Sequence, residues 1–297
     1  MQKKVGVVLV NYNGEKYITD CINSLLVQTY TAVRILIWDN HSSDGSVSLI
    51  KKKYPEIELV ESSCNYGFAK ANNLAVKKLL RQGADYILLL NTDTAADPFL
   101  IEKLLKKADE NTVTTAHIHM GKHGEKIWYA GGMLKFETGS AEHFTSGNCK
   151  DAKQVSFISG CCMMIHRDII RKHGLFDTNY FLYYEDTDLC MRWYLEGVRM
   201  YYVPDAVLWH KVGGSHGKSG NFWKKYYMVC NRLYFVNKFH NDMQISVVRV
   251  IWNIIKEDII FAREKDLTII VAVCKGIADF TLKYLRTNAI NKERKKL

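Results

Sequence analysis

Short apolar runs alternate with amphipathic segments over the first ninety residues. Four of these runs have the length of strands: residues 5–10, 33–38, 57–60 and 86–90. The last is apolar throughout, which is typical of a strand buried on both faces. Between the first two runs, Ile18, Ile22 and Leu25 follow helical spacing. Repeated strand–helix units predict right-handed β-α-β connections and a mostly parallel sheet.

The pattern changes after residue 113. Residues 113–158 are rich in Gly, His and polar side chains, and we expect short antiparallel strands and loops there. An apolar run at 156–165, interrupted by Gly160, predicts another buried strand. Residues 185–193 predict a helix that opens with three acids, as the positive end of a helix dipole favours. Residues 199–203 and 207–210 predict two further strands.

Helical spacing dominates from residue 221 onward. It predicts helices at 223–240, 244–262 and 267–285. The last is interrupted by Lys275 and Asp279, so no membrane-spanning helix is expected. We therefore predict an α/β catalytic domain at residues 1–220 and a helical, basic C-terminal extension at residues 221–297.

Positive charge is concentrated in that extension. The chain has a formal net charge of +10. Residues 221–297 hold 15 Lys and Arg against 7 Asp and Glu, or +8, which leaves +2 for residues 1–220. Basic residues interleaved with Trp and Ile predict peripheral contact with an anionic membrane surface. The alternatives are packing on the core or a contact in a homo-oligomer.

The composition also excludes some classes of protein. The basic residues are scattered through helices and form no recognisable nucleic-acid module, so no nucleic-acid partner is expected. Eight cysteines without a CxxC motif or a signal peptide predict reduced thiols in a cytoplasmic protein and no structural zinc. No GxGxxG motif follows the first strand and no Walker A motif occurs, which argues against dinucleotide and P-loop sites.

Acidic side chains stand at the ends of predicted strands. Asp39 and Asp93 follow two of them, and His210 ends the last one. Ligands of open α/β sheets bind beyond the carboxyl ends of the strands. Carboxylate and imidazole groups can hold Mn²⁺ or Mg²⁺, which would neutralise charge on a diphosphate leaving group. A further carboxylate could accept a proton from an attacking hydroxyl.

Six short motifs occur along the chain in a fixed order. They are Val-Asn-Tyr-Asn at 10–13, Asp-Asn-x-Ser-x-Asp-Gly-Ser at 39–46, Asn-x-Gly-Phe-Ala-x-Ala-Asn-Asn at 65–73, Leu-Asn-x-Asp at 90–93, Gly-Leu-Phe-Asp at 174–177 and Glu-Asp-x-Asp-Leu-Cys-x-Arg at 185–192. Together they resemble family 2 glycosyltransferases, most closely the rhamnosyltransferase-like branch, over residues 4–215. The resemblance implies a Rossmann-like glycosyltransferase-A fold, a nucleotide-sugar donor, a divalent metal and inversion at the anomeric carbon.

The resemblance also implies roles for individual residues. Those expected at the nucleotide sugar are Asn11, Tyr12, Asn13, Asp39, Gly67, Lys70, Asn73, Asn91, Thr92 and Gly160. Asp93 and His210 are expected to hold the metal, with Asn91 replacing the first acid of the family's Asp-x-Asp. Asp186 is expected to be the base, and Glu185 to orient acceptor or donor. Asp188 and Arg192 are expected to stabilise their helix.

The implied reaction moves a sugar to a saccharide or lipid-linked saccharide acceptor in bacterial surface polysaccharide synthesis. The branch suggests dTDP-rhamnose as donor. UDP-hexoses remain an alternative because the motifs read the nucleotide and diphosphate. A sugar nucleotidyltransferase, a different class, needs a Gly-rich basic loop after the first strand, and the segment at 11–14 is not one. We expect a cytoplasmic enzyme held at the inner face of the plasma membrane.

Overall fold

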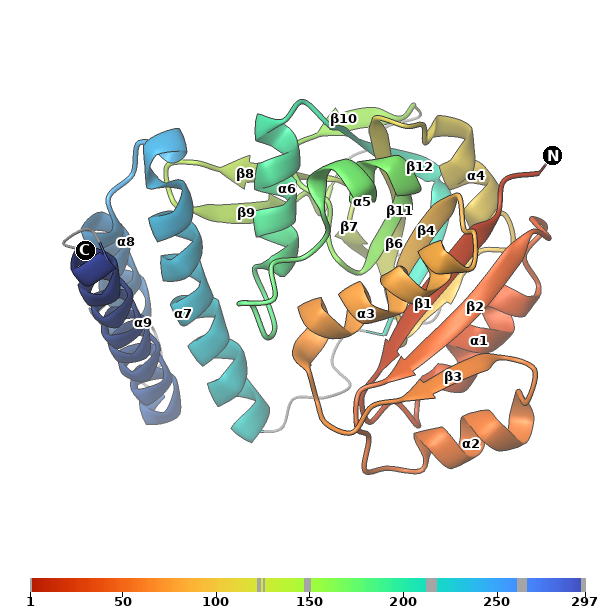
Figure 1. Ribbon diagram of the computed structural model, residues 1–297, viewed down its shortest axis with the longest axis horizontal. Coiled ribbons are helices and arrows are strands. Elements are labelled where there is room, and N and C mark those ends of the chain that lie inside the picture. The colour runs from red at the N-terminus through yellow and green to blue at the C-terminus, as the bar shows by residue number, and fades with distance from the viewer. Residues whose placement is uncertain are drawn as a thin grey trace. The chain divides into compact units, whose positions relative to one another are not determined.

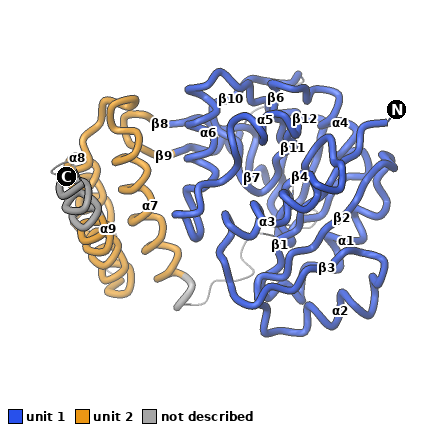
Figure 2. The backbone as a smooth tube through the Cα atoms, viewed as in Figure 1, with its two compact units in different colours: residues 1–134, 141–214 blue, residues 135–140, 215–297 orange. Residues whose placement is uncertain are grey.

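The chain forms two compact units. The computed structural model describes residues 2–121, 124, 126–146, 151–211, 218–260 and 266–294. Residues 1–134 and 141–214 make up the first unit, and residues 135–140 and 215–297 the second (Figure 2). The predicted domain division at residue 220 remains a prediction, because a compact unit is not by itself an independently folding domain.

A ten-stranded sheet organises the first unit (Figure 1). Its main path runs β10-β12-β6-β11-β4-β1-β2-β3, while β5 pairs with β12 and β7 with β6. The parallel part consists of β1 (Val5–Asn11), β2 (Val33–Asp39), β3 (Glu58–Glu61) and β4 (Tyr86–Asn91). β1 and β4 are almost wholly buried, because they are central strands with a neighbouring strand on each side. The predicted parallel α/β sheet is confirmed.

Helices connect these strands as the apolar spacing predicts. The helices of the first unit are α1 (Ile18–Leu26), α2 (Ser46–Lys53), α3 (Gly67–Arg81), α4 (Leu100–Lys107), α5 (Arg167–His173) and α6 (Glu185–Leu195). In α1, the residues at helical spacing, Ile18, Ile22 and Leu25, are buried. The crossovers bring the ends of β1, β2 and β4 to one edge of the sheet.

The other half of the sheet differs from the sequence prediction. β6 (Thr112–Met120) is a nine-residue strand that pairs in parallel with β12 (Arg199–His210), where short antiparallel strands were expected. β12 is one strand and not two, with a register shift between Val203 and Val207. Pro204 lies in the shifted segment, and a proline cannot donate to a ladder. The two predicted pieces are therefore the two sides of one irregularity.

The buried strand predicted at 156–165 is also shorter than expected. β11 (Cys162–His166) begins only after Gly160 and runs antiparallel to β4. Residues before it form a turn in which the Cys162 N–H donates to the carbonyl of Ser159. The remaining strands are β5 (Thr94–Ala96), β7 (Ile127–Tyr129), β8 (Gly132–Lys135), β9 (Ser140–His143) and β10 (Lys153–Val155).

The second unit is helical, as predicted. It contains α7 (Lys218–Met243), α8 (Val247–Ile255), the π-helical turn η1 (Lys256–Ile260) and α9 (Leu267–Arg294). The helix predicted at 244–262 thus begins later and ends in a π turn, and its last two residues lie outside the described part. Val250, Ile254 and Val273 are buried within this unit. No helix among the described residues is long and apolar enough to cross a membrane.

Candidate active site

The first acidic corner lies where β1 and β2 end side by side. Asn11 and Asp39 are register partners, and the Asn11 Nδ2 donates to Asp39 Oδ1 at 2.8 Å and to Ser46 Oγ at 2.9 Å. Asp39 also accepts from the N–H and the hydroxyl of Ser42, at 3.0 and 2.6 Å. With only 3% of its surface exposed, the Asp39 carboxylate is held in one orientation.

The loop after β1 presents Tyr12 and Asn13. Asn13 adopts a left-handed conformation with φ of 53°, and its Oδ1 accepts the N–H of Ser43 at 2.8 Å. A Cβ on Gly14 would collide with the Asn11 side chain, so a glycine is needed for this close passage. Tyr12 is 53% exposed on a loop that is otherwise tied down, which leaves its ring available to stack on a flat ligand.

The start of α3 carries Gly67 and Lys70. Gly67 has φ of +77°, and a Cβ there would collide with the Phe181 carbonyl. The next N–H, from Phe68, donates to that carbonyl at 2.8 Å. Gly67 therefore lets the loop before α6 approach α3 closely, a role that no local motif reveals. Lys70 is exposed, and its Nζ lies 4.1 Å from the centre of the Tyr66 ring.

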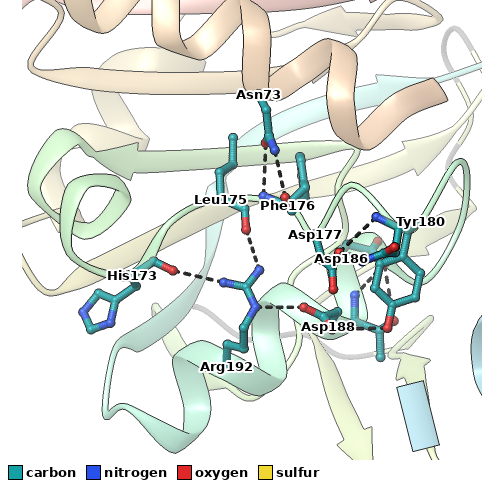
Figure 3. Close-up of polar contacts among 11 residues, drawn as sticks. Asn73, His173, Leu175, Phe176, Asp177, Tyr180, Asp186, Asp188 and Arg192 are labelled. Atoms are coloured by element: carbon teal, nitrogen blue, oxygen red, sulfur yellow. Dashed lines mark hydrogen bonds and ion pairs between the residues drawn. The ribbon is translucent and has the colours of Figure 1, made fainter. Parts of the chain in front are cut away.

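Asn73 stands apart from the other candidates. Its Nδ2 donates to the Phe176 carbonyl at 2.8 Å, and its Oδ1 accepts the Phe176 N–H at 3.1 Å (Figure 3). It borders a groove of about 520 Å³, whose other lining residues are Val76, Lys77, Leu80, Arg81, Ile170, Arg171 and Leu175. Both polar atoms of the amide hold a loop, so the predicted role of Asn73 in donor binding gains no support from its contacts.

The second group of candidates lies at the exit of β4. Asn91 ends the strand and its N–H donates to the Cys161 carbonyl at 3.1 Å. Two residues later, the Asp93 Oδ1 lies 3.1 Å from the His210 Nε2. The pairing of β5 with β12 explains this contact, since Thr94 is the register partner of His210. Thr92 is half-buried between Asn91 and Asp93. The fold thus brings together the two residues predicted to bind metal.

The metal has to be tested against these side chains. Among the described residues, no group of three or more His, Cys, Asp or Glu side chains could hold an ion. Mg²⁺ in nucleotide sites commonly keeps waters and binds one or two carboxylates together with substrate phosphates. Asp93 and His210 fit such a site, in which phosphate oxygens complete the shell. They do not fit a metal that is held by protein alone.

Asp186 and Glu185 open α6. The Asp186 Oδ2 accepts the Gly160 N–H at 3.0 Å, and its Oδ1 accepts the Thr187 N–H at 2.8 Å. Burial raises the pKa of Asp186, opposed by the Gly160 hydrogen bond and the charge of His143. Asp186 keeps some exposed surface. Gly160, predicted to lie under the donor sugar, thus also orients the predicted base.

Glu185 has a different environment although it is adjacent. It is 6% exposed, and its Oε2 has no hydrogen-bond partner among the described residues. Burial, followed by repulsion from Asp186, raises its pKa well above the ordinary value for a glutamate. Burial and the adjacent charge therefore favour the protonated form of Glu185, while Asp186 has hydrogen-bond donors that stabilise its carboxylate.

Asp188 and Arg192 support the loop that precedes α6. The Arg192 Nε donates to Asp188 Oδ1 at 2.8 Å, and its Nη1 donates to the His173 carbonyl at 3.1 Å (Figure 3). The Tyr180 hydroxyl donates to Asp188 Oδ2 at 3.2 Å. Asp188 is fully buried. These contacts agree with the structural role expected for both residues.

Two residues that the sequence prediction missed complete the site. The Trp128 ring packs at 4.6 Å and 81° against His210 and at 4.9 Å and 81° against His143. Burial lowers the pKa of His143, and the charge of Asp186 partly offsets this effect. Trp128 and His143 come from β7 and β9, in the stretch where the sequence shows no motif. The only signal there was its richness in histidine and aromatic residues.

Comparison with known proteins decides the family. The model of Glycosyl transferase family 2 matches residues 6–174, more than half of the chain. The chain belongs to glycosyltransferase family 2. Among its curated relatives is the dTDP-rhamnosyl transferase RfbF of Shigella flexneri, 25% identical over 278 residues that cover 90% of this chain and 91% of the relative.

Two further relatives of this glycosyltransferase have similar names. The rhamnosyltransferase WbbL of Escherichia coli is 27% identical, covering 74% of this chain and 87% of its own. The N-acetylglucosaminyl-diphospho-decaprenol L-rhamnosyltransferase of Mycobacterium tuberculosis is 25% identical, covering 73% and 79%. The curated relatives named here are therefore all rhamnosyltransferases, similar over most of the chain.

Solved structures bear on the fold of the glycosyltransferase. GalNAc-T7, crystallised with UDP, GalNAc and Mn²⁺, superimposes with a TM-score of 0.60 at 14% identity over 86% of this chain and 57% of its own. Staphylococcus aureus TarS with UDP gives 0.55 at 17% identity, over 84% and 68%. At such identities the likeness shows the fold alone. It confirms the predicted glycosyltransferase-A architecture.

Proposed function

We propose that this glycosyltransferase moves rhamnose from dTDP-rhamnose to a saccharide or lipid-linked saccharide acceptor, with inversion, in bacterial surface polysaccharide synthesis. The observation that carries the proposal is the set of polar residues gathered at one edge of the ten-stranded sheet. An oriented carboxylate (Asp39) and an Asp93–His210 pair lie at or just beyond the carboxyl ends of its strands, and an acid with a raised pKa (Asp186) lies at the start of α6. The rhamnosyltransferase names of its relatives support the choice of sugar.

We assign donor binding to the residues beyond the ends of β1, β2 and β4 and at the start of α3. Asp39 offers a fixed carboxylate to a donor group of the base or the ribose, and Tyr12 offers an exposed ring that can stack on the base. Lys70 brings a positive charge to the open side of α3, where a diphosphate would benefit from it. Asp93 and His210 would hold Mg²⁺ or Mn²⁺ together with that diphosphate, and a bound metal would neutralise charge on the leaving group.

We assign proton transfer to the start of α6, where Glu185 and Asp186 lie. Asp186 accepts the proton of the acceptor hydroxyl while the hydroxyl oxygen attacks the anomeric carbon and the nucleoside diphosphate leaves. A base with a raised pKa binds this proton more strongly than an ordinary aspartate. Hydrogen bonds from Gly160 and Thr187 keep its oxygens in place. Burial and the charge of Asp186 favour the protonated form of Glu185, which would avoid a second negative charge beside the base.

A donor screen tests the proposal. Release of nucleoside diphosphate is measured with dTDP-rhamnose and with UDP-hexoses, each with and without Mn²⁺ and an acceptor extract. We expect dTDP release from dTDP-rhamnose that increases with acceptor. Release from a UDP-hexose alone would change the donor. Release of pyrophosphate from a nucleoside triphosphate and a sugar phosphate would favour the nucleotidyltransferase alternative.

The second unit supports a lipid-linked acceptor. On α8, Val248 and Trp252 are 74% and 51% exposed and lie one turn apart, and the Lys256 Nζ lies 5.2 Å from the Trp252 ring centre. Apolar side chains flanked by cations suit the interface of an anionic membrane. The curated relative from Mycobacterium tuberculosis has a lipid-linked acceptor in its name.

Vesicle sedimentation tests this part separately. We expect the protein to sediment with vesicles of phosphatidylglycerol at low salt and to be released as salt screens the charges, since each basic residue near the surface contributes about 1 kcal/mol. Val248→Ser with Trp252→Ser should weaken binding. The matched control is Leu195→Ser, an exposed apolar residue of the first unit. Complete recovery of the wild type in the supernatant would contradict peripheral membrane binding.

A further inference from the structure

We infer that Trp128 is a positioning residue that keeps the imidazole of His210 facing Asp93. The inference rests on the proposed function, in which these two side chains hold the metal. Its proposed effect on the metal is exerted through His210, against which its ring packs.

His210 lacks the hydrogen bond that normally fixes a ligating imidazole. Metal-binding histidines almost always donate their other ring N–H to a carboxylate, a carbonyl or a water, which sets the tautomer and the ring orientation. The His210 Nδ1 is buried without a hydrogen-bond partner among the described residues. Its Nε2 lies 3.1 Å from the Asp93 carboxylate. One contact to a side chain that itself rotates does not fix the plane of a ring.

The Trp128 ring supplies the missing constraint. Its centroid lies 4.6 Å from that of His210, and the two planes meet at 81°. This is the edge-to-face geometry that aromatic rings favour, and it lies at the short end of the usual range of separations. A rotation of the imidazole about its Cβ–Cγ bond would lose this arrangement.

Trp128 is itself held firmly. It lies in β7, where Ile127 and Tyr129 on either side pair with β6. A second imidazole, that of His143, packs against its ring at 4.9 Å and 81°. His143 in turn stacks on Phe157 at 5.5 Å and 25°. The orientation of His210 is therefore tied to the core through a continuous row of rings.

Binding of Mn²⁺ tests the inference without measuring catalysis. Free Mn²⁺ is followed by electron paramagnetic resonance at a fixed, saturating concentration of dTDP, for the wild type and for Trp128→Phe, Trp128→Leu and His210→Ala. Loss of an outer partner of a metal ligand typically costs 10–100-fold in affinity. We expect Trp128→Leu to weaken Mn²⁺ binding about tenfold, and Trp128→Phe, which keeps a ring, to stay within about threefold.

Trp209→Phe is the matched control. Trp209 precedes His210 in β12, so its side chain points to the opposite face of the strand, where it stacks on His119 at 6.3 Å and 21°. We expect wild-type Mn²⁺ affinity. Thermal melting curves establish that each variant is folded. If Trp128→Leu does not fold, Trp128→Met, which fills more of the space without a ring, takes its place.

The outcomes separate this inference from the proposed function. If His210→Ala weakens Mn²⁺ binding and Trp128→Leu does not, the role of Trp128 is wrong and the metal site stands. Equal weakening by Trp209→Phe would also overturn it, because general loosening of β12 would then explain the loss. If the wild type binds no Mn²⁺, or His210→Ala binds it as the wild type does, His210 is not a metal ligand, and both proposals fail at that point.

Discussion

The two acidic corners of the active site are built differently. At the ends of β1 and β2, the Asp39 carboxylate accepts hydrogen bonds from Asn11 and Ser42. At the start of α6, Asp186 stands directly beside Glu185, and burial raises the pKa of both. One corner holds a fixed acceptor for a ligand. The other places two carboxyl groups side by side, where burial favours their protonated forms.

The difference follows from how each corner is made. Asp39 accepts two hydrogen bonds from Ser42, three residues further on, and one from Asn11, its register partner on the neighbouring strand. Asp186 accepts a hydrogen bond from Gly160, in the turn before β11, and the charge of His143, on β9, also acts on it, so its environment is made by segments outside α6. Tyr183 and Tyr184, just before them, both have positive φ, 67° and 71°. Strained backbone of this kind often occurs at functional sites, where the surrounding structure holds it in place.

Replacing the base should have the largest effect. Asp186→Asn removes the proton acceptor but keeps shape and most hydrogen bonds, and general-base assistance is worth about 10²–10⁴ in rate. We expect transfer to fall by at least a hundredfold while the affinity for the nucleotide-sugar donor, measured by calorimetry, stays near that of the wild type. A variant that keeps more than about a tenth of wild-type turnover would show that another group is the base.

Removing a proposed metal ligand should have the next largest effect on activity. Asp93→Ala and His210→Ala each remove one of two protein ligands, so we expect each to lower activity about 10–100-fold at limiting Mn²⁺. Excess Mn²⁺ should partly restore His210→Ala, because Asp93 and the donor phosphates remain. The measurement is turnover over a Mn²⁺ titration. Undiminished wild-type activity in excess chelator would mean that transfer needs no metal.

Glu185 should leave a signature in the pH dependence of stability. Its folded pKa is raised above its unfolded value, so the native state binds more protons than the unfolded state between the two. Stability is then full below the unfolded pKa of about 4.3 and falls as pH rises toward the folded pKa, by up to about 1.4 kcal/mol per pH unit. Glu185→Gln should flatten this fall.

Thermal melting over pH 4–9 measures the effect of Glu185→Gln. We expect the variant to gain on the wild type as pH rises. Glu196→Gln, at an exposed acid after the same helix, is the control for an acid that is not buried. Parallel curves of melting temperature against pH for the wild type and Glu185→Gln would show that Glu185 has the same pKa in the folded and the unfolded protein.

Removing a hydrogen bond to Asp39 should lower both the stability of the protein and its affinity for the donor. Asn11→Ala removes a buried donor to Asp39, Ser42 and Ser46, and leaving such acceptors unpaired typically costs about 1–3 kcal/mol. We expect a lower free energy of unfolding in urea and a higher KM for the donor. Ser43→Ala, nearby and exposed, should change stability by less than about 0.5 kcal/mol. Equal effects of the two would remove the special role of Asn11.

Much of the donor half could be predicted from local sequence. The apolar runs that become β1, β2 and β4 are short and continuous, and polar residues stop each of them, so strand ends and candidate ligands are visible together. Parallel strands then bring Asn11, Asp39 and Asn91 to one edge, whatever the details of packing. The family motifs added the proposed roles of these residues but not their geometry.

Other features depended on tertiary contacts. β6 pairs in parallel with β12 although their first residues, Thr112 and Arg199, are 87 positions apart, so no local pattern in the sequence records the pairing. The groups that Gly67 and Asn73 contact, Phe181 and Phe176, lie on a distant loop.

The sequence by itself determined the parallel strands β1 to β4, the helices that connect them and the acids at the strand ends, because apolar periodicity and polar stops are local properties of the chain. Only the tertiary structure decided that Trp128 and His143 join the site and that Asn73 holds a loop. It also decided that Glu185 is buried beside Asp186. Burial and ring packing depend on which distant segments meet, and the pKa of a carboxyl group follows from that meeting and not from its neighbours in sequence.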